Sequence, residues 1–248
     1  YSPMGCRSFL GEYIDENGYF KYEGRFNIGV VSINLPQIAI VANGNENKFW
    51  EVLNQRLELC KEALLFRYEL LKGTPSDVSP ILWRYGGLAR LESGETIDKL
   101  LENGYASISL GYIGVYEAVK LLTGSTHTQE KELALNIVKR LREACDTWKK
   151  ETGLGFGLYG TPSEGLCNRF AQIDKAKYGV IKDVTDKGYY TNSYHVDVRE
   201  EIDAFSKLAF EAQFHPISSG GAISYVEMPN MGKNIEAVEQ LVNYIYHN

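Results

Sequence analysis

The sequence predicts an α/β fold made of five strand–helix units. Two observations lead to this prediction. Short β-branched runs alternate with longer stretches of helical period, and 44% hydrophobic with 23% charged residues is the balance of an ordinary globular protein. Right-handed crossovers set such strands mostly parallel, with helices outside. Five units do not close an eight-stranded barrel, so we expect an open sheet or half of a larger barrel, formed by residues 1–248 as one segment.

The first two units are predicted in the first part of the chain. The run GVVSIN at residues 29–34 predicts a buried strand, and apolar residues at three- and four-residue steps then predict a long amphipathic helix to about residue 71: Phe49, Leu53, Leu57, Cys60 and Leu64. Residues 73–80, with two prolines, form a predicted loop, and a short helix is expected around residues 95–103. The second strand is predicted at residues 107–110 and is followed by a helix at residues 116–122. Another long helix is marked by Leu133, Ile137, Leu141, Cys145 and Trp148.

The remaining units follow Gly153, which is typical of the residue just after a helix end. A third strand is predicted at residues 155–159. Thr161, Pro162 and Glu164 then have the pattern of a helix start, with an N-cap, a proline at the first helical position and a capping-box acid. Further strands are predicted at residues 190–196 and 222–226, followed by helices at residues 202–212 and 235–245.

The charge and hydropathy of the chain argue against two classes of partner. Its 26 basic and 32 acidic residues give a net charge of −6, whereas nucleic-acid binding relies on clustered Lys and Arg, so we expect no nucleic-acid partner. The most apolar stretch, residues 28–41, is interrupted by polar residues and is shorter than the roughly 20 residues of a membrane span. We therefore expect no membrane partner. No signal peptide is visible, and because the chain starts at Tyr1 and stops in a helical pattern, we interpret it as a piece of a longer polypeptide.

The cysteine and histidine spacings predict no metal site. The four cysteines, Cys6, Cys60, Cys145 and Cys167, form no CxxC pair, and His127, His215 and His247 lack metal-ligand spacing. Cys60 and Cys145 lie on the apolar faces of predicted helices, where a reduced thiol behaves as a small hydrophobe. These features favour a reducing, cytoplasmic setting.

Two residues near the start of the chain are candidates for chemistry. Cys6 lies in SPMGCRSFL, a Gly- and Pro-containing stretch without helical period, and the neighbouring Arg7 could favour its thiolate. The alternative is a loop cysteine without a role. Asn27, just before the first strand, has a neutral amide that can donate and accept hydrogen bonds, although asparagine is also common there for local backbone reasons.

Three later stretches are further candidates. YGTPSEGL at residues 159–166 places a helix N-terminus after a strand, which favours an anion, although Glu164 would repel phosphate and the pattern also fits a plain capping box. SSGGAISY at residues 218–225 has a glycine pair that permits close approach of a ligand or only a turn. His195 is interpreted first as a core or near-core histidine, and a Cys6–His195 nucleophile pair is conceivable, but no third, orienting residue can be named.

Taken together, these stretches resemble one enzyme family. PMGCRSFL, GRFNIGVVSINLPQIAI, ISLGYIG, ETGLGFGLYGTPSEGL with RFAQID, VTDKGYYTNSYHV and SSGGAISYVEMP occur in an order and spacing similar to those of the catalytic subunit of anaerobic, class III ribonucleoside-triphosphate reductases, which are glycyl radical enzymes. The likeness covers nearly all of the chain. It implies an activity, the radical-based reduction of ribonucleoside triphosphates to 2′-deoxyribonucleoside triphosphates without oxygen, which serves DNA replication.

The resemblance also implies a fold and roles for particular residues. The fold would be the second half of a ten-stranded α/β barrel, with residues 1–27 as the finger loop. Cys6 would carry the thiyl radical that removes the ribose 3′ hydrogen, Asn27 would lie near the ribose hydroxyls, and Met4 would mark an enzyme that uses formate as reductant. Substrate phosphates would bind at the following five residues: Thr161, Pro162, Ser163, Glu164 and Gly165.

The sequence departs from the family pattern by what it lacks. No RVxGY-like stretch with the radical-storing glycine occurs in it, nor the four-cysteine zinc site, nor the N-terminal half of the barrel. The resemblance therefore implies a segment that is inactive alone. Activity would need the rest of the reductase polypeptide, which would be a homodimer as the full enzyme, and a radical-SAM activating enzyme. Two alternatives remain at this point: a nucleotide-binding half-barrel without catalysis, and a cysteine hydrolase that uses Cys6 and His195.

Overall fold

A three-stranded parallel sheet is the centre of the molecule. The computed structural model describes residues 2–3 and 8–247. Within them, the strands β3 (Phe26–Asn34), β4 (Ala106–Ile113) and β5 (Gly155–Tyr159) pair in the order β3–β4–β5, all parallel. A separate antiparallel pair is formed by β1 (Ser2–Pro3) and β2 (Phe9–Leu10). The predicted α/β class and the first three predicted strands are confirmed.

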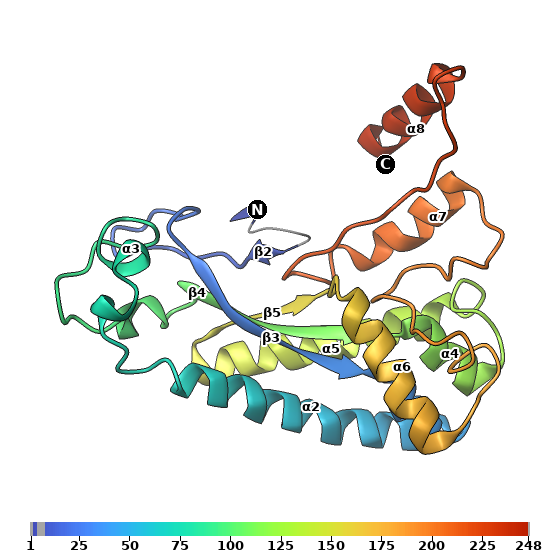
Figure 1. Cartoon of the computed structure of the whole chain (residues 1–248), viewed down its shortest axis with the longest axis horizontal. Coiled ribbons are helices and arrows are strands. Elements are labelled where there is room, and N and C mark those ends of the chain that lie inside the picture. Colours follow the sequence, from blue (N-terminus) through green and yellow to red (C-terminus); the bar gives the residue numbers. More distant parts are fainter. Residues whose placement is uncertain (1, 4–7, 248) are drawn as a thin grey trace.

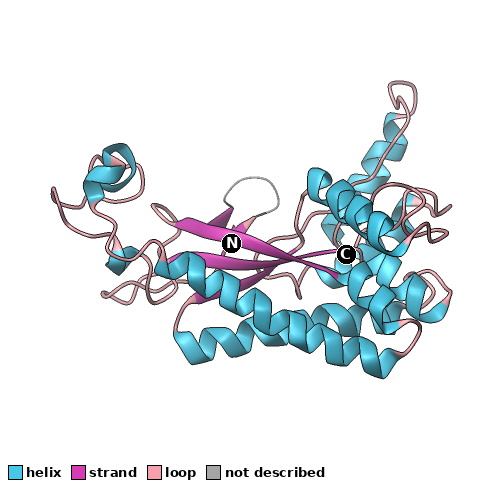
Figure 2. Ribbon diagram, turned by 60° about the horizontal axis from the view of Figure 1, so that its bottom comes forward, coloured by secondary structure: helices cyan, strands magenta, loops and turns pink. Residues whose placement is uncertain are grey.

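Helices connect the strands and cover one face of the sheet. Figure 1 shows α2 and α5 beneath the strands, with β2 on the opposite side, and Figure 2 shows the strands as one layer alongside the long helices. The α-helices are α1 (Leu35–Ala42), α2 (Glu46–Glu69), α3 (Pro80–Trp83), α4 (Val115–Thr123), α5 (Lys131–Thr152), α6 (Glu164–Tyr178), α7 (Ala204–Glu211) and α8 (Ile235–His247). Short 3₁₀ turns occupy Ser76–Val78, Asp98–Leu100 and Ala212–Phe214.

The core lies between the sheet and this helical layer. Leu110 and Leu158 of the strands are fully buried, as are Leu53 of α2 and Ile137 of α5. Cys145, on the same face of α5, is also fully buried, as its place in the apolar pattern predicts. None of the helices in the described part of the chain combines the length and hydropathy that a membrane span needs.

Two predicted strands are wrong. Residues 190–196 form an irregular buried segment, because their backbone pairs with the start of α4 and not with another strand. The amide of Gly114 donates to the carbonyl of Thr191 (3.0 Å), and the amide of Val115 donates to that of Ser193 (3.2 Å). Residues 222–226 are not a strand either, and only Gly221 forms a parallel bridge, to Tyr159. Aromatic and β-branched residues here indicate burial and not sheet pairing.

Three helical segments also differ from the prediction. The expected helix at residues 95–103 is only the 3₁₀ turn Asp98–Leu100. The sequence analysis missed α1, which begins directly after β3, where the Asn34 side chain accepts a hydrogen bond from the Gln37 amide (3.1 Å). The helix predicted to start at Thr161 begins at Glu164, with Ser163 in the N-cap position. The predicted end of α5 is confirmed, because Gly153 follows it with φ +71°.

Candidate functional site

One face of the sheet consists mainly of small residues. Alternation along β4 places Ser107, Ser109 and Gly111 on this face, and their register partners on β5 include Gly155 and Gly157. These side chains leave room above the sheet for a cavity of about 470 Å³. Phe9, Leu10 and Gly11 line its other side, and α5 contributes Arg142, Asp146 and Lys149 to the lining. In Figure 1 this face of the sheet lies beneath the N-terminal strand pair.

Asn27 lies on this face at an irregularity of β3. The pairing with β4 shifts register between Asn27 and Val30, and Gly29 in between has φ +151°. The Asn27 Oδ1 atom accepts a hydrogen bond from the Gly29 amide (2.7 Å), and its Nδ2 donates to Ser109 Oγ (2.7 Å). The amide is therefore fixed in orientation by its own strand and by β4. A side chain would be strained at this φ whatever the space around it, so this backbone shape favours glycine.

Cys6 and Met4 lie outside the described residues, but the chain that follows them is placed. Ser8 is buried, and the Phe9 amide donates to the carbonyl of Gly220 (2.8 Å). The Gly11 amide donates to Ser107 Oγ on the small-residue face (3.3 Å). A position of Cys6 beside Asn27 stays a prediction.

Thr161 lies over the same face at the carboxyl ends of the strands. Its Oγ1 is 3.2 Å from Ser32 Oγ and donates to the carbonyl of Tyr159 (3.3 Å). A Cβ on Gly111 would lie only 2.0 Å from Thr161 Oγ1, so this glycine makes room for the threonine. Thr161 thus packs down onto the sheet and does not cap α6, which corrects the predicted capping box.

The four residues after Thr161 lead into α6. Pro162 and Ser163 are half-buried, Gly165 is exposed with open space around it, and the side chain of Glu164 is not described. The first amides of a helix have no acceptor within it, and they form the positive end of the helix dipole. The N-terminus of α6 can therefore bind an anion next to Thr161, close to the small-residue face.

A buried carboxylate that the sequence analysis missed holds α6 in place. Asp174 is fully buried and accepts hydrogen bonds from Asn34 Nδ2 (2.8 Å), Gln37 Nε2 (2.6 Å) and the hydroxyl of Tyr190 (2.9 Å). These partners come from the end of β3, from α1 and from the buried segment 190–196. The bonds fix α6, and therefore its N-terminus, relative to the strand that carries Asn27.

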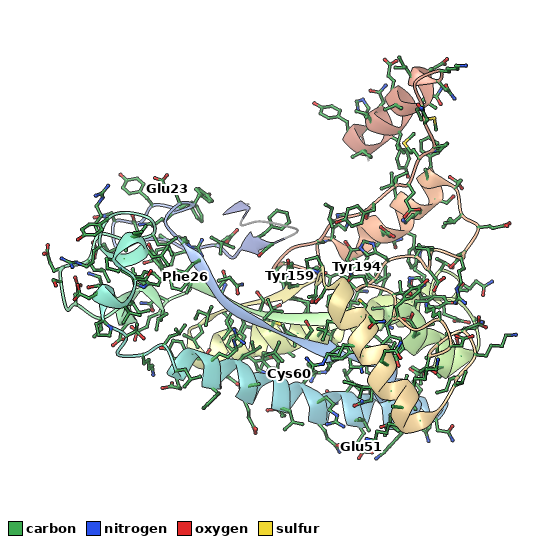
Figure 3. The ribbon with its side chains drawn as sticks, viewed as in Figure 1. Glu23, Phe26, Glu51, Cys60, Tyr159 and Tyr194 are labelled. Carbon is green, nitrogen blue, oxygen red and sulfur yellow. The ribbon has the colours of Figure 1, made fainter. Side chains whose placement is uncertain are left out.

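A second buried polar cluster lies around Lys187. Lys187 Nζ is 2.6 Å from Glu117 Oε1 and also bonds to Asp197 Oδ2. Burial alone would lower the pKa of Lys187, but the two carboxylates outweigh it and raise the pKa. Burial disfavours the charged form of Asp197, yet hydrogen bonds from Arg199 and Lys187 lower its pKa to about 2. The cluster holds the segment that leads to Tyr194. The Tyr194 ring packs against Gly160, the residue before Thr161, and Figure 3 shows Tyr194 near Tyr159.

Two histidines, His127 and His195, have neighbours typical of a protein interior. The prediction that His195 is a near-core residue is confirmed, since it is 8% exposed and its Nδ1 is 3.2 Å from Glu211 Oε2. Glu211 is a buried carboxylate beside the His195 ring that the sequence did not identify. His127 is fully buried, and burial lowers its pKa to about 4. Within residues 2–3 and 8–247, no three side chains of the metal-binding types gather as a site.

Comparisons with known proteins add family and fold. The family model of anaerobic ribonucleoside-triphosphate reductase matches residues 1–248. The chain is 47% identical over 250 residues to the proteins of that name from Escherichia coli and Salmonella typhimurium, with 99% of this chain covered, and 45% identical over 248 residues to that of Enterobacteria phage T4, with 98% covered. It spans 35% of the length of the two bacterial relatives and 40% of the phage protein.

Solved structures show the same fold at lower identity. The anaerobic ribonucleotide reductase of Thermotoga maritima, with citrate in the active site, has a TM-score of 0.68 and 21% identity, covering 89% of this chain and 39% of that one. The same enzyme in complex with dATP and CTP has a TM-score of 0.65 and 22% identity, covering 90% of this chain and 38% of that one.

Proposed function

The chain belongs to the anaerobic ribonucleoside-triphosphate reductase family, and we propose that it forms part of the catalytic barrel of such an enzyme. In this proposal the complete polypeptide reduces ribonucleoside triphosphates to 2′-deoxyribonucleoside triphosphates. Residues 1–27 are its finger loop, and the small-residue face of the sheet lines the inside of the barrel. The enzyme works in the reducing cytoplasm, as a homodimer that a radical-SAM enzyme activates.

The observation that supports this function best is the shared face of Asn27 and Thr161. Asn27 donates to Ser109, and Thr161 packs over Gly111, two residues further along β4. Two residues of strand span about 7 Å, a separation that the ribose and 5′-phosphates of one nucleotide can bridge. A single substrate can therefore contact both, with its ribose at Asn27 and its phosphates at the α6 N-terminus.

Each residue then has a distinct task. An amide has two N–H donors, and Asn27 uses one on Ser109, so the other can orient a ribose hydroxyl without adding a charge. Thr161, Pro162, Ser163, Glu164 and Gly165 bind the phosphates, with backbone amides of α6 as the donors. The Cys6 sulfur removes the hydrogen atom at C3′ as a thiyl radical, forms an S–H bond, and returns that atom at the end of the cycle.

The remaining groups lie outside these residues. A glycyl radical elsewhere in the complete polypeptide supplies the unpaired electron, and a zinc site belongs to that same absent region. We propose formate as the reductant, on the basis of Met4 and Asn27. Enclosure of the reaction above the small-residue face keeps water from the radical.

Replacement of Cys6 in the complete, activated enzyme tests this function. We expect Cys6→Ser to form the glycyl radical, seen by electron paramagnetic resonance, but to yield no deoxynucleotide. Cys60→Ala is the matched control, because Cys60 is a buried helix residue in the core and not on the small-residue face. We expect this variant to retain activity. Deoxynucleotide formation by Cys6→Ser would overturn the assignment. A wild-type enzyme that binds nucleotide but forms no product would favour a binding module.

A further inference from the structure

Arg25 connects three segments of the chain through backbone carbonyls. Its Nη1 donates to the carbonyls of Gly11 (2.7 Å) and Lys21 (3.2 Å), Nη2 donates to that of Gly104 (2.7 Å), and Nε donates to that of Tyr105 (2.9 Å). Gly11 and Lys21 are the two ends of the segment 11–21, which follows the strand pair β1–β2. The other two acceptors immediately precede β4.

This contact is costly, which indicates a specific role. Arg25 is only 5% exposed, and burial lowers its pKa. Among the described residues its hydrogen-bond partners are carbonyls and not carboxylates. A buried charge without a counter-ion is unfavourable unless its donors are satisfied. The planar guanidinium group of Arg25 directs four N–H donors at these four carbonyls. The three rotating N–H donors of a lysine ammonium group cannot reproduce that geometry.

The arginine is also joined rigidly to the candidate site. Arg25 directly precedes β3, which begins at Phe26, and it is two residues from Asn27 along the chain. Tyr105, whose carbonyl accepts from Arg25, also donates from its hydroxyl to the carbonyl of Gly24 (2.5 Å). The strand that orients the Asn27 amide is therefore fixed to the segment that follows Cys6.

We propose that Arg25 is a positioning residue, which fixes the base of the N-terminal segment, residues 11–21, over the small-residue face and so holds that segment in a constant position relative to Asn27. This inference rests on the proposed function. Arg25 itself contacts no substrate, and it acts through the carbonyls of Gly11 and Lys21. A misplacement of about 1 Å between reacting groups can reduce a rate by about 100-fold, so loss of the fork should affect the rate more than substrate binding.

The test compares Arg25→Lys with wild type in the complete, activated enzyme. This change keeps the charge and removes the planar fork. We expect kcat for deoxynucleotide formation to fall by about 10- to 100-fold, with KM changed less than about threefold and the glycyl radical yield unchanged. Hydrogen–deuterium exchange should increase in residues 8–21 and stay unchanged in β4. Arg84→Lys is the matched control, since Arg84 pairs with Asp77 at the surface, and it should leave kcat unchanged.

Three outcomes would overturn the inference. The first is a wild-type kcat in Arg25→Lys. The second is a loss of activity that only follows a loss of folded protein, measured as the melting temperature. The third is a rise in KM alone. If Cys6→Ser abolishes the reaction while Arg25→Lys is fully active, only the role of Arg25 fails. If Cys6→Ser is active, the proposed function itself fails.

Discussion

Gly111→Ala is the sharpest perturbation that the structure offers. A Cβ at this position would lie 2.0 Å from Thr161 Oγ1, 2.4 Å from Ser32 Oγ and 3.0 Å from Val30 Cγ1. Because heavy atoms in ordinary contact are about 3.5–4 Å apart, Thr161 must move by more than about 1 Å. We expect the unfolding free energy to fall by about 1–3 kcal/mol, the usual cost of an overfilled core.

The same displacement should weaken nucleotide binding. Thr161 directly precedes α6, so its movement shifts the helix N-terminus that we assign to the phosphates. A loss of about 1.4 kcal/mol there raises the Kd for a ribonucleoside triphosphate about tenfold. Urea denaturation and calorimetric titration of the complete enzyme measure the two effects. Gly157→Ala is the control for stability, because its nearest neighbour, the Cα of Gly220, would be 3.4 Å from the new Cβ.

A double-mutant cycle locates the cause. If the clash with Thr161 Oγ1 is responsible, Thr161→Ala should recover part of the stability that Gly111→Ala loses, giving a favourable coupling energy of at least about 0.5 kcal/mol. Gly111→Ala with unfolding free energy and nucleotide affinity both at wild-type values would refute this description of the site.

Three further predictions concern buried groups. Lys187→Met leaves the buried Glu117 and Asp197 without their cation and should lower the unfolding free energy by about 3–5 kcal/mol, measured by urea denaturation. The pKa of His127 is about 4 in the folded protein, below its ordinary value of 6.5. The unfolded chain therefore binds the extra proton between these pH values, and stability should fall as the pH drops from 6.5 to 4, by about 3 kcal/mol in all; a pH series of melting temperatures should show a shallower fall for His127→Phe. Burial raises the pKa of Cys145, so iodoacetamide at pH 8 should modify this thiol only after unfolding, as mass spectrometry will detect; modification of the native protein would contradict its burial.

Local sequence patterns predicted much of the fold. Gly153 and the run 155–159 mark the end of α5 and the whole of β5 correctly, because a helix-ending glycine and a short apolar run are signals of one turn or one strand. The same kind of composition failed at residues 190–196. Whether an apolar run pairs as a strand depends on which backbone groups lie beside it, and here these belong to the start of α4.

The candidate site was predicted in part. Asn27 and Thr161 were identified from the sequence, and the structure brings them to one face of the sheet. The role of Thr161 as an N-cap was wrong, since Gly111 on a different strand provides the space into which its side chain packs. Cys6 lies outside the described residues, and its role stays a prediction.

The sequence by itself determined the α/β alternation, the core-facing stripes of the helices and the family, because each depends on residue order alone. Only the tertiary structure decided which polar groups are buried and what satisfies them. Asn34 and Asp174 are 140 residues apart, and Arg25 and the carbonyl of Tyr105 are 80 apart. A buried carboxylate or guanidinium is stable only where folding brings its partners within hydrogen-bond distance, and no local pattern specifies those partners.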